Sequence, residues 1–381
     1  MTMLDLSLVE ARTLAVGAQY LHRSDPVSGG VGSALERLGC VQLDTIQVVR
    51  RSHEMILLAR HETTPEEPSF LEHHDQPYFF EYWAHAASVI PMGSWPLFAF
   101  RRRRFAADGW RGPAVDAATV DQVRQQVKDS GPVTVTDLGG ARGSGWERSS
   151  PHKWAAEWLL ATGEFVCVRR RRFSRVYQTA ESAVPGELLA REPSDQECFP
   201  ALTGIALRAL GVATAEDVAD YFRLPKNVVA DTLADHPEAV PVRVEGWPDV
   251  TWGHASVLGQ PPLVRQDAVT PLSPFDSLIW HRPRMRRLFG VEYLLEAYKK
   301  SALRECGYFG MPVLAGTEIT GRLALRVRDG VAEVEGHQLR DGADPAHHTR
   351  AAATAAAWAA ARPPAQPLPW LSTPPVTGGA S

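Results

Sequence analysis

The chain has 381 residues, of which 44% are hydrophobic and 22% charged, and its formal net charge at pH 7 is −4. Such a length exceeds one small domain, and the composition suits a globular protein with a sizeable core. The slightly acidic balance excludes a globally basic nucleic-acid binder, so any contact with nucleic acid would depend on local basic patches. No stretch approaches the roughly 18 apolar residues of a membrane helix, so a cytoplasmic protein with no membrane contact is expected.

Residues 1–114 predict a winged-helix module with an inserted segment. Apolar residues recur at helical spacing in residues 6–21, and a second helix is expected to end near Gly39. The apolar run 55–60 then reads as a strand. Two helices followed by a strand are typical of helix-turn-helix and winged-helix units.

Residues 115–192 predict a second winged-helix module. Residues 120–138 read as a helix, a Gly-Pro break and a strand-like Val/Thr step. A strong helix then closes at Gly163, and two strands follow with an arginine-rich turn between them. This is the order of a recognition helix and a wing hairpin.

Residues 193–269 predict a third module of the same kind. Residues 206–236 contain three helical pieces, with Thr214 as the expected N-cap of one of them. Residues 239–254 read as a hairpin with a Gly-containing turn.

Residues 270–345 alternate short strands with Gly turns, which predicts a small C-terminal antiparallel β-barrel-like domain. Residues 346–381 form an Ala/Pro-rich tail with one expected helix over 349–361. The predicted fold class is therefore α+β, with three tandem winged-helix modules ahead of the β-domain.

Two clusters of four consecutive arginines stand in different modules, and a phenylalanine follows each. Arginine forks match phosphate oxygens, and a wing hairpin is a usual place for such contacts. A solvated charge run is the alternative for each cluster. The clusters are Arg101, Arg102, Arg103 and Arg104 in the first module, and Arg169, Arg170, Arg171 and Arg172 in the second.

Gln42 and Asp44 interrupt the apolar pattern of "VQLDTIQVV". Residues two apart in an extended segment face the same side, so Leu43 would point the other way, into the core. An amide and a carboxylate on one side can hold a water between them, and the carboxylate can accept its proton or stabilise a nearby cation. The alternative is that both are ordinary polar positions of a strand or helix.

At this motif the sequence resembles the AlkZ/AlkX (YcaQ-like) winged-helix DNA glycosylases. Three blocks carry the resemblance in the same order: "VQLDTIQVVRRSHEMILLARH", "YFFEYWAHAASVIP", and "LSPFDSLIWHRPRMRRLFGVEYLLEAYKK" with "GYFGMPVLAGTEITGRLAL". The resemblance spans nearly the whole chain. It implies three winged-helix modules and a β-barrel-like domain around a channel for double-stranded DNA.

The resemblance also implies a chemistry. Members of the family carry a Gln-hydrophobe-Gln or a Gln-hydrophobe-Asp motif, and Gln42-Leu43-Asp44 is similar to the second, AlkX/YcaQ, branch. That branch is associated with N7-alkylated purines and interstrand crosslinks of the nitrogen-mustard type. Asp44 would stabilise positive charge on the deoxyribose and position or deprotonate the attacking water, which Gln42 would hold.

A monomeric, monofunctional glycosylase of base excision repair, with no metal or organic cofactor, is therefore expected. No lysine adjoins the motif to form a Schiff base, and the histidines fit no metal-ligand spacing. The alternative is a winged-helix transcriptional regulator that binds DNA without catalysis; such regulators usually dimerise on half-sites.

Five further residues near the motif and in the second block are candidate contacts to DNA. Arg50, Arg51 and His53 would contact backbone phosphate or the lesion, with surface charge at a strand start as the alternative. Trp83 would stack on a base, with ordinary packing as an equal alternative. His85 would contact the lesion or support a residue that does.

Overall fold

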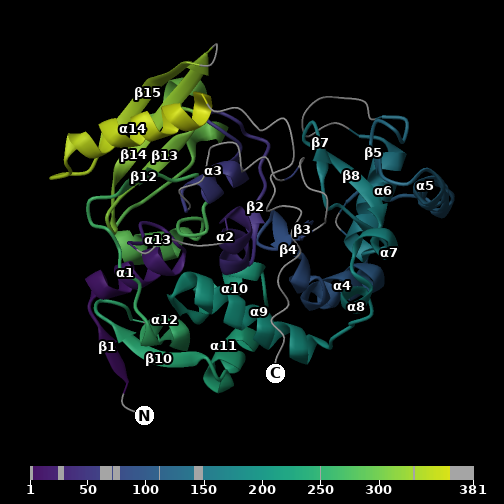
Figure 1. The fold of residues 1–381 in the computed structure, drawn as a ribbon, viewed down its shortest axis with the longest axis horizontal. Coiled ribbons are helices and arrows are strands. Elements are labelled where there is room, and N and C mark those ends of the chain that lie inside the picture. The colour runs from purple at the N-terminus through teal and green to yellow at the C-terminus, as the bar shows by residue number, and fades with distance from the viewer. Residues whose placement is uncertain are drawn as a thin grey trace. The chain divides into compact units, whose positions relative to one another are not determined.

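The structure is a computed structural model that describes residues 3–24, 30–60, 71, 78–110, 112–140, 149–248, 250–328 and 331–360. The chain divides into two compact units. Of the described residues, the first unit contains 3–24, 30–60, 84–88, 199–248, 250–328 and 331–360, and the second contains 71, 78–83, 89–110, 112–140 and 149–198. Figure 1 labels their helices and strands, which make a mixed α and β structure with several separate sheets.

One four-stranded sheet of the first unit joins the N-terminus to residues from the middle of the chain. Its strand order is β1-β10-β11-β9, with β1 parallel to β10 and the other pairs antiparallel. The predicted hairpin over 239–254 is confirmed by the β10–β11 pair. The strands are β1 (Leu4–Leu6), β9 (Val212–Thr214), β10 (Ala239–Val244) and β11 (Thr251–His254).

Helices of the first unit begin where the sequence supplies caps. The Ser7 hydroxyl accepts a hydrogen bond from the Glu10 amide at 3.2 Å, and the Glu10 carboxylate accepts one from the Ser7 amide at 2.8 Å. Thr214 is the N-cap of α10, as predicted, and accepts from the Asp217 amide at 3.2 Å. The helices are α1 (Leu8–Ala18), α9 (Asp195–Leu210), α10 (Ala215–Phe222), α11 (Lys226–Asp235), α12 (Ala255–Gly259) and α13 (Arg282–Phe289).

The Gln42-Leu43-Asp44 motif lies between α2 (Gly30–Leu38) and α3 (Ser52–Leu58), on and just after β2 (Val41–Gln42). The strand predicted over 55–60 is wrong, because residues up to Leu58 form α3. A short apolar run fits a buried helix as well as a strand. The helix start decides it here, since the Glu54 carboxylate accepts from the Arg51 amide at 3.2 Å.

The C-terminal strands form an open antiparallel sheet in the order β12-β13-β14-β15, and α14 lies across it (Figure 1). A closed barrel is not observed, because β12 and β15 are the two ends of this ladder and do not pair. Ala351, Ala355 and Trp358 of α14 are buried. The elements are β12 (Val269–Pro271), β13 (Gly310–Ala315), β14 (Glu318–Arg328), β15 (Val331–Leu339), α14 (Pro345–Ala360) and the short 3-10 helices η5 (Glu296–Tyr298) and η6 (Ser301–Leu303).

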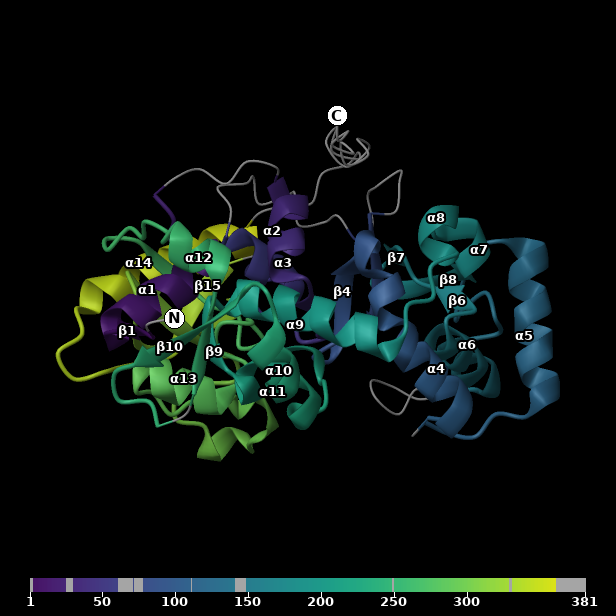
Figure 2. The same ribbon diagram turned by 90° about the horizontal axis from the view of Figure 1, so that it is seen from below.

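The second unit pairs two long helices, α5 and α6, beside a small sheet (Figure 2). The predicted order of helix, strand, helix closed by Gly163, and hairpin is confirmed. Gly163 has a φ of 85°, the left-handed conformation that favours glycine at a helix end. The elements are β3 (Phe79–Trp83), β4 (Ala87–Pro91), η2 (Met92–Ser94), η3 (Pro96–Phe98), α4 (Ala99–Asp108), α5 (Ala117–Ser130), β5 (Val133–Thr134), α6 (Pro151–Thr162), β6 (Phe165–Val166), β7 (Arg170–Arg171), β8 (Ser174–Thr179), α7 (Ala180–Ala183) and α8 (Gly186–Leu189).

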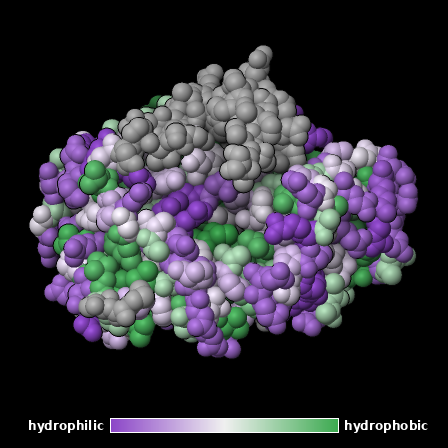
Figure 3. Space-filling model, turned by 60° about the horizontal axis from the view of Figure 1, so that its bottom comes forward, coloured by the Kyte–Doolittle hydropathy of each residue, from purple (hydrophilic) through white to green (hydrophobic). Residues whose placement is uncertain are grey.

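Hydrophilic side chains predominate on the face drawn in Figure 3, with smaller hydrophobic groups between them. None of the helices in the described ranges combines the length and apolar character needed to cross a membrane.

Candidate active site

Gln42 and Asp44 lie on the side of their segment that faces away from the core. Val41 and Leu43 are 1% and 7% exposed, whereas Gln42 and Asp44 are only partly buried. The segment stays extended past β2, because the Leu43 amide donates to the carbonyl oxygen of Ala87 at 2.8 Å. The burial therefore alternates with the period of two expected from the sequence.

Asp44 is a half-buried carboxylate with which no cation pairs in the described part of the chain. Burial raises the pKa of Asp44 above its ordinary 3.8, against the opposing effect of the Ile46 and Thr45 amides. The Ile46 amide donates to Oδ1 at 2.8 Å. Within the described residues no cation pairs with Asp44, and the Gln42 amide group makes no hydrogen bond. Among the residues that the structure describes, the site thus offers a carboxylate without a counter-charge beside an amide group without a protein hydrogen bond.

Residues from all three sequence blocks meet around this motif within the first unit. The hydroxyls of Ser52 and Ser273 lie 2.9 Å apart. Arg60 forms a two-pronged ion pair with Asp276, at 2.7 and 2.8 Å, and both side chains are fully buried. These contacts join α3 to the third block, and the Leu43–Ala87 hydrogen bond joins the motif to the second.

Tyr298 is an exposed aromatic residue near Asp44 that the sequence did not single out among eight tyrosines. It is 76% exposed, and burial together with the negative charge of Asp44 raises the pKa of Tyr298. Glu296 anchors the loop that carries Tyr298, because its Oε2 accepts hydrogen bonds from the Glu305 and Cys306 amides at 2.9 Å each. A firmly anchored loop therefore presents an aromatic ring beside the carboxylate.

A family model described as DNA glycosylase AlkZ-like matches residues 35–362 of this chain. The chain belongs to the AlkZ-like DNA glycosylase family. It is therefore a DNA glycosylase, an enzyme of DNA repair, and the regulator alternative does not hold. Among solved structures it is similar to the Streptomyces sahachiroi DNA glycosylase AlkZ, with a TM-score of 0.60 and 16% identity, over 96% of this chain and 99% of that chain. At this identity the likeness concerns the fold.

In this AlkZ-like glycosylase, Arg50 and His53 are buried, at 5% and 1% exposed, and Arg51 is partly buried. The Arg50 Nε donates to the Glu54 carboxylate at 2.9 Å. Although burial raises the pKa of Glu54, the charges of His53 and Arg50 lower it overall. Surface charge at a strand start therefore does not describe these residues, and contact of the three with DNA stays a prediction.

His85 of the glycosylase lies in a crowded polar setting. Its Nδ1 is 3.2 Å from the Asp220 carbonyl oxygen and 3.4 Å from the Asp220 carboxylate. Its Nε2 is 3.2 Å from an Arg223 nitrogen, and Trp280 covers one ring face. Burial lowers the pKa of His85 to about 4 despite the charge of Asp220, so the imidazole is neutral at pH 7.

The first arginine cluster occupies α4, where consecutive side chains point in different directions. Arg101 donates to the carbonyl oxygen of Trp83. Arg102 is buried, donates to the Trp95 carbonyl oxygen at 2.9 Å, and lies 4.2 Å from the Trp95 ring centroid. Arg103 pairs with Asp195 at 2.6 Å, and Arg104 is 77% exposed with a weak 3.7 Å pair to Asp108. Arg104 is thus the most available member for a phosphate.

The second cluster lies on the β7–β8 hairpin, whose turn residues Arg172 and Phe173 both have positive φ. Arg170 forms a two-pronged ion pair with buried Glu81. Arg171 is 58% exposed with a 3.7 Å pair to Asp137, and within the described residues the side chains of Arg169 and Arg172 have no partner. Arg169 and Arg172, together with the weakly paired Arg171, are therefore available to a phosphate.

Trp83 packs in the second unit. Its ring lies against the core formed by α5 and α6, and the Arg175 guanidinium is 5.5 Å from the ring centroid. The packing alternative describes this contact, and stacking on a base stays a prediction.

Proposed function

We propose that this glycosylase hydrolyses the N-glycosidic bond of N7-alkylated purines and unhooks nitrogen-mustard crosslinks, with Asp44 and Gln42 as its catalytic residues. One observation carries the proposal: Asp44 is a half-buried carboxylate with no cationic partner among the described residues. An unpaired carboxylate in a partly desolvated place is suited to stabilise positive charge that arrives or develops nearby.

The chemistry matches this charge. Alkylation at N7 makes the purine cationic, so it leaves as a neutral base with the electron pair of the broken C1′–N9 bond. Positive charge then resides on the deoxyribose, where Asp44 opposes it. A water held by Gln42 and Asp44 adds to C1′, and its proton passes to the Asp44 carboxylate and on to solvent.

Two features support a crosslink as substrate. The Gln-hydrophobe-Asp motif resembles that of the crosslink-associated branch. A crosslinked base is tethered to the opposite strand and so needs an open site, and Asp44 is partly exposed while its neighbour Tyr298 is 76% exposed.

DNA binding is assigned to winged-helix modules. The element order α9-β9-α10-α11-β10-β11 in the first unit supports one module, and α5-β5-α6-β6-β8 in the second supports another. On the second, the exposed arginines Arg169, Arg171 and Arg172 would lie along the DNA backbone as a wing. Several modules in one chain favour a monomer on one duplex, which light scattering of the free and DNA-bound protein tests.

The deciding experiment measures base release from duplexes carrying N7-methylguanine or a nitrogen-mustard crosslink. Wild type should release both, and Asp44→Asn should lose roughly 100- to 1000-fold in rate, the scale for removing one charge-stabilising group. Asp231→Asn, at an exposed position of α11 in the same unit, is the matched control. Undiminished release by Asp44→Asn rejects the assigned role, and release of neither lesion rejects the substrates.

A monofunctional reaction is part of the proposal. Lys299 and Lys300 follow Tyr298, but the Lys299 ammonium is 3.0 Å from the Glu296 carboxylate. Borohydride reduction during turnover should trap no covalent complex. A trapped complex that disappears in Lys300→Arg would show lyase chemistry instead.

A further inference from the structure

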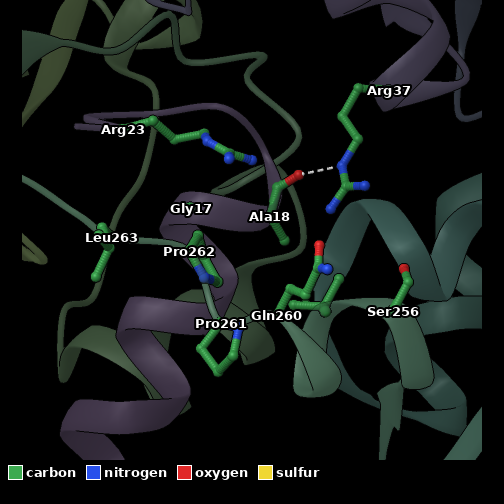
Figure 4. Close-up of a pocket in the computed structure, with 10 residues that line it drawn as sticks. Gly17, Ala18, Arg23, Arg37, Ser256, Gln260, Pro261, Pro262 and Leu263 are labelled. Carbon is green, nitrogen blue, oxygen red and sulfur yellow. Dashed lines mark hydrogen bonds between the residues drawn. The ribbon is translucent and has the colours of Figure 1, made fainter. Parts of the chain in front are cut away.

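A pocket of about 440 Å³ in the first unit has no role in the proposed reaction. It lies between the end of α1, helix α2, and α12 with the loop that follows it. Figure 4 shows Arg23 and Arg37 extending toward Ala18 from two sides, with the Gln260 amide facing the end of Arg37. Gln260 and Ser256 are exposed, so the pocket opens to solvent.

Arg37 has no counter-charge in contact with it among the described residues. The Arg37 Nε donates to the Ala18 carbonyl oxygen at 2.6 Å, and within the described residues Arg37 has no other hydrogen bond and no ion pair. Burial, with the nearby cations of Arg208 and Arg23, lowers the pKa of Arg37 to about 10, although Tyr20 acts in the opposite direction. The Arg208 Nε is also buried without a hydrogen-bond partner among the described residues, although Arg208 has an acidic neighbour: its charge opposes the burial that raises the pKa of Glu36.

The segment that leads to Arg23 has an unusual backbone conformation. Tyr20 and His22 have φ of 61° and 52°, a left-handed region that non-glycine residues rarely adopt and that occurs often at ligand clamps. The guanidinium carbons of Arg23 and Arg37 both lie 5.3 Å from the centroid of the Tyr20 ring. The Tyr20 ring therefore lies close to both guanidinium groups and brings them to one site.

Neighbouring contacts keep this segment in place. The Arg265 amide donates to the His22 carbonyl oxygen at 2.7 Å, and the Ser24 amide donates to that of Leu263 at 2.9 Å. Pro262 packs so closely on α1 that a Cβ at Gly17 would lie 2.3 Å from it. The cations are therefore arranged before any ligand arrives.

We infer that this pocket binds a phosphate group through Arg37 and Arg23, with Gln260 and Ser256 at its mouth. Planar guanidinium forks pair with phosphate oxygens, and an anion would relieve the repulsion among the arginines. A DNA backbone and a free phosphorylated molecule share this chemistry. The inference does not depend on the role given to Asp44.

The test begins with inorganic phosphate and the full chain. Phosphate should raise the unfolding temperature saturably, beyond sodium chloride at equal ionic strength, because a ligand that binds only the folded state stabilises it. Arg37→Gln should weaken the apparent phosphate affinity about tenfold or more. Gln260→Glu, which adds a negative charge at an exposed position and leaves the fold undisturbed, should do the same. Arg243→Gln removes an exposed arginine that pairs with exposed Asp5, and should bind phosphate as wild type does.

Salt dependence of DNA affinity separates the two sources. If the pocket takes a DNA phosphate, the slope of log affinity against log salt falls by about one in both pocket variants and not in Arg243→Gln. If the pocket binds a free phosphorylated molecule, the salt slopes of the pocket variants equal that of wild type. Phosphate still raises the unfolding temperature of these variants less than that of wild type. Two results together overturn the inference. Phosphate protects wild type no better than chloride does, or it protects wild type and all variants equally, and in either case the salt slopes of the pocket variants equal the slope of wild type. Base release, measured in parallel, tests the proposed function separately.

Discussion

The imidazole of His85 lies flat against the indole of Trp280, with ring centroids 4.0 Å apart and planes 6° apart. His85 is two residues from Ala87, whose carbonyl oxygen accepts the Leu43 amide. The stack therefore fixes the short segment that runs beside the Gln42-Leu43-Asp44 motif to the C-terminal half of the first unit. This arrangement gives His85 a positioning role, in addition to the lesion contact predicted from the sequence.

Variants of His85 separate these two roles. His85→Phe keeps a flat ring against Trp280 and should retain most base release. His85→Ala removes the ring pair, worth about 0.5–1.5 kcal/mol beyond the area it buries, and should lower both stability and base release. Urea unfolding and single-turnover kinetics of both variants provide the comparison. An equal loss of base release in the two variants, with stability retained by His85→Phe, would show that the imidazole itself contacts the lesion.

The raised pKa of Asp44 predicts an acid limb in the pH–rate profile. The carboxylate is lost as pH falls through a value above 3.8, so the rate should fall with it, after subtraction of spontaneous base loss. Because the pKa is higher in the folded state, the ionised carboxylate of Asp44 lowers the free energy of unfolding at neutral pH. This loss of stability disappears as pH falls below 3.8. Asp44→Asn should therefore be at least as stable as wild type at pH 7 while lacking the limb. If the acid limb persists in Asp44→Asn, another titrating group causes it.

Tyr298 should act through its ring rather than its hydroxyl. Stacking of an aromatic side chain on a base contributes about 1–3 kcal/mol, so Tyr298→Ala should weaken base release roughly 5- to 100-fold. Tyr298→Phe preserves the ring and should stay close to wild type. The side chain is 76% exposed, so neither change should affect the unfolding temperature by much. Wild-type activity in Tyr298→Ala would exclude a contact with the substrate.

Features with local signals were predictable from the sequence. The Thr214 cap, the hairpin over 239–254 and the helix closed by Gly163 all depend on residues within a few positions of each other. The alternation around Leu43 was predictable for the same reason, because a period of two is a property of the strand itself.

Features that depend on distant residues were not predictable in this way. The run over 55–60 reads as a strand until Glu54 is seen to start a helix, and the open edge of the C-terminal sheet is a matter of tertiary pairing. Tyr298 lies more than 250 positions after Asp44, so only the folded chain identifies it. Four consecutive arginines look alike in sequence, yet Arg102 is buried while Arg104 is exposed, since helical neighbours point about 100° apart.

The buried carboxylate of Glu81 predicts that the second unit loses stability in acid. Its carboxylate is buried between Arg170 and Arg175, and despite burial these charges and hydrogen bonds lower the pKa of Glu81 to about 2. A depressed pKa contributes stability that is present above the ordinary value of 4.5 and is lost as pH falls from there toward 2. The second unit should therefore become easier to unfold across that pH range.

Glu81→Gln should remove most of this pH dependence and destabilise the second unit at pH 7 by about 3–5 kcal/mol, because partly buried Arg170 loses its carboxylate partner and Arg175 loses one of its two, keeping Glu157 at 2.7 Å. Glu164→Gln is the matched control, since Glu164 pairs with Arg124 at 2.6 Å on the surface of the same unit, where such pairs contribute about 0–1 kcal/mol. Hydrogen exchange at pH 7 and pH 3 follows α6 and the β7–β8 hairpin directly. Equal protection in Glu81→Gln and Glu164→Gln at pH 7 would mean that the buried ion pairs do not hold the hairpin in place.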